Sequence, residues 1–204
     1  IDVGGYYKAG NAVGVFGRSS FLIFIVVLGI ESARQTVARL KKGRRMEELE
    51  QFALNDSMTG MYNRNAYDYF VKNEKDFEGY VIVTFDLNNL KQCNDQYGHR
   101  AGDEYIINAA HIIEDNFERY GKCYRIGGDE FCCIIPKGRY FKIERVMHKI
   151  DQDVEILNHK NIIPVPVGIA YGYAVFTADD TDPEKVRERA DKDMYRNKKT
   201  MKQS

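Results

Sequence analysis

The segment from Tyr80 to Leu87, which reads YVIVTFDL, constrains the fold more than any other part of the chain. Its residues are β-branched, aromatic or aliphatic at almost every position, which is typical of a strand buried on both faces. The chain must therefore supply covering layers on either side of the sheet that contains this strand. Asp86 lies at the end of the segment, and a buried carboxylate is costly unless it is paired or binds a metal.

The remainder of the body alternates between helical and extended patterns. Helices are predicted over residues 64–75, 102–120, 140–158 and 183–201, and strands over residues 122–125, 131–135 and 165–176. The two short strands flank Gly127 and Gly128, which predicts a hairpin with the glycines at its tip. We therefore expect an α/β or α+β domain with at least one antiparallel strand pair, beginning near residue 56.

The first thirty residues differ from this body. Residues 21–30 read FLIFIVVLGI and carry no charge, but a spanning helix needs about 20 apolar residues. Three interpretations are open: the cytoplasmic half of a last transmembrane helix, the core of a signal peptide, or a helix packed on a partner. Six basic residues between positions 34 and 45 favour the first, because the positive-inside rule expects them at a cytoplasmic exit.

We therefore expect residues 1–31 to end a transmembrane segment, with the body in the cytoplasm beneath an inner or plasma membrane. The chain begins with Ile1 rather than Met, so an N-terminal membrane or sensor region is expected before it. Residues 32–55 contain no proline and a single glycine, and are predicted to form a helix that links this region to the body. Their apolar positions do not join in one heptad register, so a short coiled coil and a solvated linker both remain open.

Composition narrows the partners and the compartment. The 30 Lys and Arg residues balance 30 Asp and Glu residues, so net charge gives no reason to expect nucleic-acid binding. The four cysteines form no C-x-x-C pair and no zinc-ligand spacing, which fits a reduced compartment; they are Cys93, Cys123, Cys132 and Cys133.

Acidic residues fall where two predicted strands end. Asp86 closes the buried strand, and Asp129 and Glu130 directly follow the hairpin glycines, which let a backbone approach a ligand closely. If the hairpin lies beside the buried strand, Asp86 and Asp129 converge and suit a hard cation such as Mg²⁺, which catalyses phosphoryl and nucleotidyl transfer. On turn chemistry alone, the same four-residue sequence is more often a plain turn.

Four blocks in the chain resemble a known family. Residues 127–131 spell GGDEF, and the other blocks are DSMTGMYNR (56–64), DLNNLKQCNDQYGHRAGD (86–103) and ADKDMYRNKK (190–199). In this order and spacing they resemble the GGDEF-domain family of diguanylate cyclases, with residues 56–204 as the catalytic domain. The resemblance implies a central, mostly antiparallel sheet flanked by helices, similar to the polymerase palm and the class III nucleotide cyclases.

The resemblance also implies a reaction and its partners. Members of the family join two molecules of GTP into cyclic di-GMP and release two pyrophosphates. Each protomer holds one GTP, so catalysis requires a homodimer, and the cofactor is Mg²⁺ or Mn²⁺. No nucleic acid takes part.

Site residues follow from the resemblance position by position. The metal ligands implied are the Asp86 and Asp129 carboxylates and the main-chain carbonyl of Leu87. The catalytic residues implied are Asp129, which helps to deprotonate the attacking 3′-hydroxyl, Glu130 beside it, and Arg125, which stabilises charge in the transition state. The substrate residues implied are Asn94 and Asp103 for guanine, Lys198 and Lys202 for the terminal phosphates, and the backbone of Asn89, Leu90, Gly127 and Gly128.

Two positions depart from the family pattern. Asn88 stands where the family often has a second acid, which lowers the negative charge near the metals. The product-inhibition motif R-x-x-D is absent, because its positions hold Glu118, Arg119, Tyr120 and Gly121. The alternative to a cyclase is a non-catalytic domain that binds GTP or cyclic di-GMP, and Asn88 is the one change that favours it.

Overall fold

The structure is a computed structural model that describes residues 26–42, 53–138 and 142–201. The chain divides into two compact units, residues 1–50 and 51–204. In the first unit, residues 26–42 form a helix whose side chains are all exposed. No helix within the described ranges is long and apolar enough to span a bilayer. Residues 1–25 of the predicted membrane segment and residues 43–52 of the predicted linker helix lie outside those ranges.

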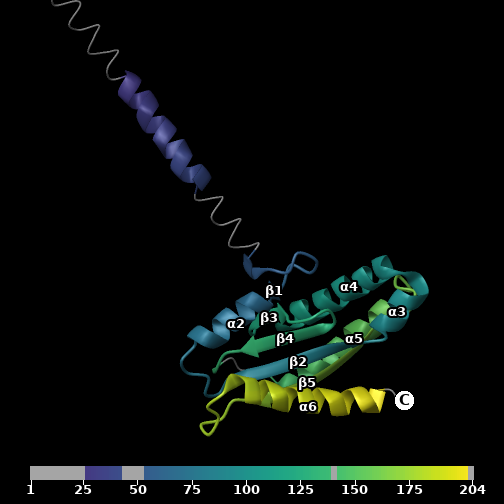
Figure 1. Cartoon of the computed structure of the whole chain (residues 1–204). Coiled ribbons are helices and arrows are strands. Elements are labelled where there is room, and N and C mark those ends of the chain that lie inside the picture. The colour runs from purple at the N-terminus through teal and green to yellow at the C-terminus, as the bar shows by residue number, and fades with distance from the viewer. Residues whose placement is uncertain (1–25, 43–52, 139–141, 202–204) are drawn as a thin grey trace, which may run out of the picture. The chain divides into compact units, whose positions relative to one another are not determined.

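The second unit is built on a five-stranded sheet (Figure 1). Its strands follow the order β1-β3-β4-β2-β5, and their bounds are β1 Tyr62–Asn63, β2 Val81–Asn88, β3 Lys122–Arg125, β4 Glu130–Ile135 and β5 Gly168–Val175. Only β1 and β3 are parallel, and every other neighbouring pair is antiparallel. The predicted central, mostly antiparallel sheet is confirmed, and the continuously apolar strand β2 has a neighbour on each side.

Helices cover both faces of this sheet. Their bounds are α2 Arg64–Asn73, α3 Leu90–Tyr97, α4 His99–Phe117, α5 Ile143–His159 and α6 Pro183–Met201. Buried residues of α3, α4 and α5 form one core with the sheet, and those of α2 and α6 form a second core on its other face. Residues of β2 alternate between the two cores, as the pleat of a strand requires.

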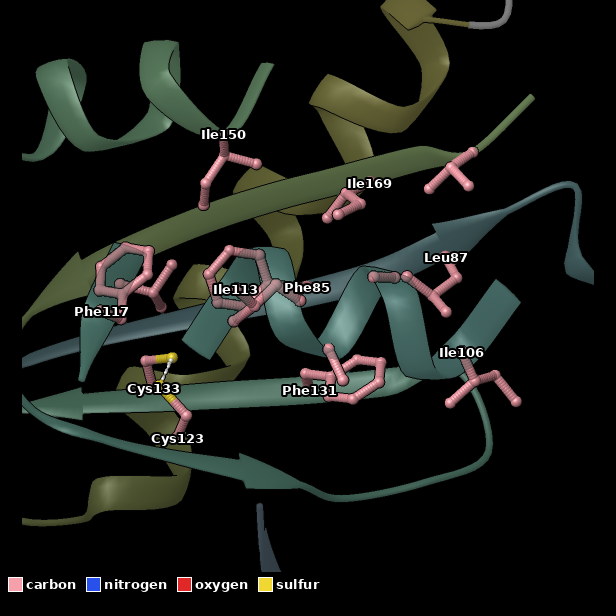
Figure 2. Close-up of a cluster of buried hydrophobic side chains, with 14 of the residues drawn as sticks. Phe85, Leu87, Ile106, Ile113, Phe117, Cys123, Phe131, Cys133, Ile150 and Ile169 are labelled. Atoms are coloured by element: carbon pink, nitrogen blue, oxygen red, sulfur yellow. Dashed lines mark hydrogen bonds between the residues drawn. The ribbon is translucent and has the colours of Figure 1, made fainter. Parts of the chain in front are cut away.

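The first core shows how this alternation directs Asp86. Phe85 and Leu87 of β2 lie among the apolar side chains of the α4 and α5 face, near Ile113 and Ile106 (Figure 2). Asp86 lies between them in sequence, so its side chain points to the opposite face, which α6 covers. The fold therefore turns one carboxylate at the end of a buried strand towards a single helix.

Two cysteines in the first core and one in the second follow the same rule. Cys123 and Cys133 are directly paired across β3 and β4, and the Cys133 thiol donates a hydrogen bond to the Cys123 sulfur at 2.9 Å (Figure 2). Cys132 belongs to the second core. Cys132 and Cys133, which are adjacent on β4, thus lie on opposite faces of the sheet.

Helix α6 approaches β5 unusually closely. A Cβ atom on Gly172 would lie 2.1 Å from the main-chain nitrogen of Met194 and 2.4 Å from the main-chain oxygen of Ala190. Only glycine leaves room for backbone at that separation. This contact fixes the distance between α6 and the sheet, and so the distance from which α6 residues can reach β2.

Sequence patterns missed two elements. Strand β1 and helix α3 were not predicted, and α4 begins at His99 rather than at residue 102. In α2, Tyr69 is 67% exposed, while Tyr67 is buried at 2%. Tyr67 donates its hydroxyl to Glu184 of α6, so it spans the second core as an amphipathic side chain.

Candidate functional site

The hairpin between β3 and β4 is held against the end of β2 by main-chain contacts. The Leu87 N–H donates to the Asp129 carbonyl at 3.1 Å, and Asp86 is the register partner of Glu130. The sequence analysis expected Asp86 and Asp129 to converge if the hairpin lay beside the buried strand. The hairpin does lie there. Acidic residues of two neighbouring strands therefore gather at one end of the sheet.

The Arg125 side chain holds the hairpin tip in place through hydrogen bonds to its main chain. Its guanidinium donates to the carbonyls of Gly127 at 3.2 Å and Gly128 at 2.9 Å, and it pairs with Asp56 at 3.0 Å. The side chain is only 12% exposed. These contacts make Arg125 a positioning residue for the tip, whereas its transition-state role remains a prediction.

Asp56 completes this clamp, a link that the sequence analysis did not foresee. Thr59 donates both its main-chain N–H, at 2.9 Å, and its hydroxyl, at 2.8 Å, to the Asp56 carboxylate. Burial raises the pKa of Asp56, but the hydrogen bonds from Thr59 and Arg125 outweigh it and leave the pKa below its ordinary value. The block at residues 56–64 thus anchors the hairpin electrostatically. The sequence offered only the acidic residue Asp56 at the start of this block, with nothing to indicate that Arg125 is its partner.

The two glycines of the tip play different parts. A Cβ on Gly127 would lie 3.1 Å from the Glu130 Oε2 atom, whereas a Cβ on Gly128 would meet nothing within 4 Å. Neither residue takes a left-handed backbone conformation. The fold therefore does not require glycine at position 128, and the open space beside it suits the close approach of a ligand to the backbone.

Lys198 brings positive charge to the acidic end. It lies near the C-terminal end of α6, and its ammonium donates to the Asp86 carboxylate, with side-chain exposures of 23% and 16% for the pair. The contact joins residues 112 positions apart in the chain. Lys202, the second predicted phosphate residue, lies outside the described ranges.

The predicted guanine residues lie on α3 and α4. Asn89 adopts a left-handed conformation, with φ of 64°, and opens α3, which carries Asn94. A Cβ on Gly102 would lie 1.9 Å from the Asn94 Oδ1 atom, so the amide of Asn94 rests directly against the α4 backbone. Asp103, the next residue, is exposed. Asn94 and the residue before Asp103 are thus in contact, and the role of Asn94 and Asp103 in binding guanine stays a prediction.

The donor atoms at the acidic end fit a hard cation that also binds substrate. Across the described part of the chain, no three His, Cys, Asp or Glu side chains gather into a metal-binding group. The metal ligands implied by the family resemblance are all oxygen: the Asp86 and Asp129 carboxylates and the Leu87 carbonyl, from the end of β2 and the hairpin that is bonded to it. Mg²⁺ is typically held by one or two carboxylates and completed by substrate phosphates and water. The set therefore suits Mg²⁺ bound together with a phosphate ligand.

Asn88 leaves one polar atom of the site unpaired. The residue is buried at 6% exposure, and its Oδ1 atom has no hydrogen-bond partner among the described residues. Its amide nitrogen lies 3.7 Å from the Met201 sulfur, a weak contact. The departure from an acid at this position thus places a neutral acceptor beside the predicted metal ligands.

Comparison with known proteins decides the family. The family model described as "Diguanylate cyclase, GGDEF domain" matches residues 53–204. The chain belongs to the GGDEF-domain family. Its sequence is 30% identical over 172 residues to the bifunctional diguanylate cyclase/cyclic di-GMP phosphodiesterase MucR of Pseudomonas aeruginosa, covering 80% of this chain and 24% of the relative.

Other GGDEF proteins agree. The diguanylate cyclase DgcS of Shewanella oneidensis is 29% identical over 158 residues, covering 74% of this chain and 52% of the relative. The chain thus spans between about a quarter and about half of these relatives. Among solved structures, the coiled coil and GGDEF domain of DgcB from Caulobacter crescentus, in complex with c-di-GMP, superposes with a TM-score of 0.70 at 23% identity. That match covers 85% of this chain and 95% of the other, and it shows the shared fold.

Proposed function

We propose that this GGDEF domain is a diguanylate cyclase, which condenses two molecules of GTP into cyclic di-GMP and releases two pyrophosphates. The observation that carries the proposal is the intact Gly-Gly-Asp-Glu tip held by the bond from the Leu87 N–H to the Asp129 carbonyl. That bond brings Asp129 beside the end of β2, where Asp86 lies opposite Glu130. Family membership and two named cyclase relatives support the same reaction.

In this proposal the oxygen ligands hold Mg²⁺, or Mn²⁺ in its place. Asp86, Asp129 and the Leu87 carbonyl would bind it, and the ion supplies charge stabilisation on the phosphates and acidity to the attacking hydroxyl. Asp129 accepts the proton of the 3′-hydroxyl, with Glu130 directly beside it. Lys198 exchanges its contact with Asp86 for a phosphate once substrate binds, because the two anions compete for one ammonium group.

The remaining residues bind and orient GTP. The Asp103 carboxylate accepts from the guanine N1–H and its amino group, and Asn94 both donates and accepts. Main-chain groups of Asn89 and Leu90, at the left-handed turn, face the phosphates. The open backbone at Gly127 and Gly128 admits the nucleotide to the tip.

Catalysis requires two protomers, because each holds one GTP and both 3′-hydroxyls must attack. We propose that residues 32–55 couple the catalytic domain to an N-terminal membrane or sensor region, with the domain in the cytoplasm. The basic cluster after residues 21–30 supports this orientation. The chain's short span on its relatives is consistent with further domains in the full protein.

A direct product assay tests the reaction. The chain is incubated with GTP and Mg²⁺, alone and fused to a strong parallel dimeriser, and the nucleotides are separated. We expect cyclic di-GMP, with more from the fused dimer, and none from Asp129→Asn although its circular dichroism is unchanged. Asp115→Asn, an exposed acid of α4, serves as the matched control and retains activity. Equal turnover by Asp129→Asn would refute the assignment.

The second candidate is a regulatory domain that binds GTP or cyclic di-GMP without turnover. The neutral, buried Asn88 beside the metal ligands favours it, because less negative charge weakens divalent-cation binding. Nucleotide binding without product, even in the enforced dimer, would establish this alternative. Asn88→Asp would then be expected to restore product formation.

A further inference from the structure

The hydroxyl of Tyr105 joins two strands at the edge of the proposed nucleotide site. It donates to the main-chain carbonyl of Asn88 and accepts from the Gly168 N–H at 2.7 Å. Asn88 and Gly168 are the last register pair between β2 and β5. The Pro166 carbonyl is a more distant second acceptor at 3.3 Å. A side chain of α4 therefore closes the end of the β2–β5 ladder.

Apart from these hydrogen bonds, Tyr105 is an ordinary residue of the buried core. The residue is fully buried, and its ring belongs to the core between the sheet, α4 and α5. Burial raises the pKa of the phenol, so the hydroxyl keeps its proton and its donor at physiological pH. A buried hydroxyl is satisfied only where it finds partners, and this one has a main-chain acceptor and a main-chain donor.

The carbonyl that Tyr105 holds lies directly before the turn that faces the phosphates. Asn89 takes its left-handed conformation immediately after Asn88 and opens α3. The same helix α4 presses Gly102 against Asn94 and presents Asp103. The first two turns of α4 therefore contact the loop before α3 and the predicted base residue Asn94 on α3. They also carry the second predicted base residue, Asp103.

We infer that Tyr105 is a positioning residue that sets the backbone of the Asn88–Leu90 loop for the nucleotide phosphates. The inference deepens the proposed function and rests on it where substrate is concerned. The hydroxyl fixes the Asn88 carbonyl, which fixes the plane of the peptide that leads into Asn89. Tyr105 acts through the main chain and touches no reacting atom.

Tyr105→Phe tests this role, because it removes only the hydroxyl and keeps the ring in the core. In the enforced dimer we expect KM for GTP to rise about tenfold, while kcat changes by less than about threefold. Amide chemical shifts give a readout that needs no nucleotide. The shifts of Asn89 and Leu90 should move in Tyr105→Phe, because the peptide plane that leads into Asn89 is no longer fixed.

Tyr67→Phe is the matched control, because it deletes another buried hydroxyl, the one that donates to Glu184 at 3.2 Å. It should leave KM and the amide shifts of Asn89 and Leu90 unchanged, even if it lowers the melting temperature equally. Gly168→Ala is the second variant. Its Cβ would lie 3.1 Å from the Asn88 Cβ, so it displaces the same residue without removing the hydroxyl, and we expect the same KM rise.

The outcomes separate this inference from the proposed function. Unchanged amide shifts at Asn89 and Leu90 in folded Tyr105→Phe overturn the positioning role, whatever the activity. Altered shifts in a protein whose wild type makes no cyclic di-GMP overturn the cyclase proposal and leave the positioning role intact. If Tyr105→Phe does not fold, unchanged KM and unchanged shifts of the loop amides in Gly168→Ala overturn the inference in its place.

Discussion

Gly102→Ala should strengthen the fold and weaken nucleotide binding at the same time. Gly102 lies in the first turns of α4, where alanine is favoured over glycine by about 1 kcal/mol. The new Cβ would lie 1.9 Å from the Asn94 Oδ1 atom, so the two cannot coexist. That oxygen ends a short, rotatable side chain, and the fold can yield by turning it away.

The size of both effects depends on the Asn94 side chain being the part that moves. The free energy of unfolding should change by between about 0 and +1 kcal/mol, the gain in helix propensity less the lost packing of Asn94. Turning Asn94 away would remove the hydrogen bonds proposed between Asn94 and guanine, worth about 1.5 kcal/mol together, so GTP should bind about tenfold more weakly. Urea unfolding and calorimetric titration with GTP measure the two quantities on one protein preparation.

A double-mutant cycle sharpens the test. If Gly102→Ala acts through Asn94, adding Asn94→Ala to it should weaken GTP binding no further. Gly29→Ala is the matched control, a helical glycine whose Cβ would meet nothing within 4 Å, and it should leave GTP affinity unchanged. Unaltered GTP affinity in Gly102→Ala would refute the reasoning. So would a loss of more than about 2 kcal/mol of stability, because Asn94 would then be immovable.

Three further predictions concern stability and reactivity. Gly172→Ala presses a Cβ into the backbone of α6, so it should cost about 3 kcal/mol and lower the melting temperature by about 10 °C in a thermal scan. The pKa of Asp56 is lower folded than unfolded, so the unfolded chain binds its proton first as pH falls. Urea unfolding from pH 7 to pH 3 should show Asp56→Asn less stable than wild type above the ordinary pKa near 4 and equal to it below the folded pKa. All four cysteines are buried, and burial raises the pKa of Cys93, Cys132 and Cys133, so Ellman's reagent should titrate four thiols in urea and none natively.

Elements with strong local signals could be predicted from sequence. Strand β3 and helix α6 have the bounds expected for them, and β2 differs from its prediction by one residue at each end. Their signals were a β-branched run for β2, the hairpin glycines for β3 and a helix-opening proline for α6, all of which act within a few residues. Helix α3 buries only Leu90 and Cys93 and begins at a left-handed asparagine, so its pattern was too short to recognise.

Features that depend on contacts between distant parts of the chain could not be predicted from local sequence patterns. Strand β1 consists of two residues and is defined only by its pairing with β3. The placement of the hairpin beside the end of β2 depended on strand order, which no local pattern in the 80–87 segment specifies. The clamp of Asp56 on Arg125 joins residues 69 positions apart, and Lys198 reaches Asp86 across 112. Resemblance to the family supplied the roles of these residues, and the fold supplied their neighbours.

The open space at Gly128 bears on how such a domain would change over time. A Cβ atom at this position would meet nothing within 4 Å, and the backbone there has no left-handed angle. Replacing Gly128 by a residue with a side chain should therefore leave folding and stability unchanged. Only the demand that a ligand pass close to the tip opposes a larger residue there. A descendant that no longer binds this ligand would therefore be free to change first at position 128, whereas any residue larger than glycine at position 172 would cost stability through its contact with α6.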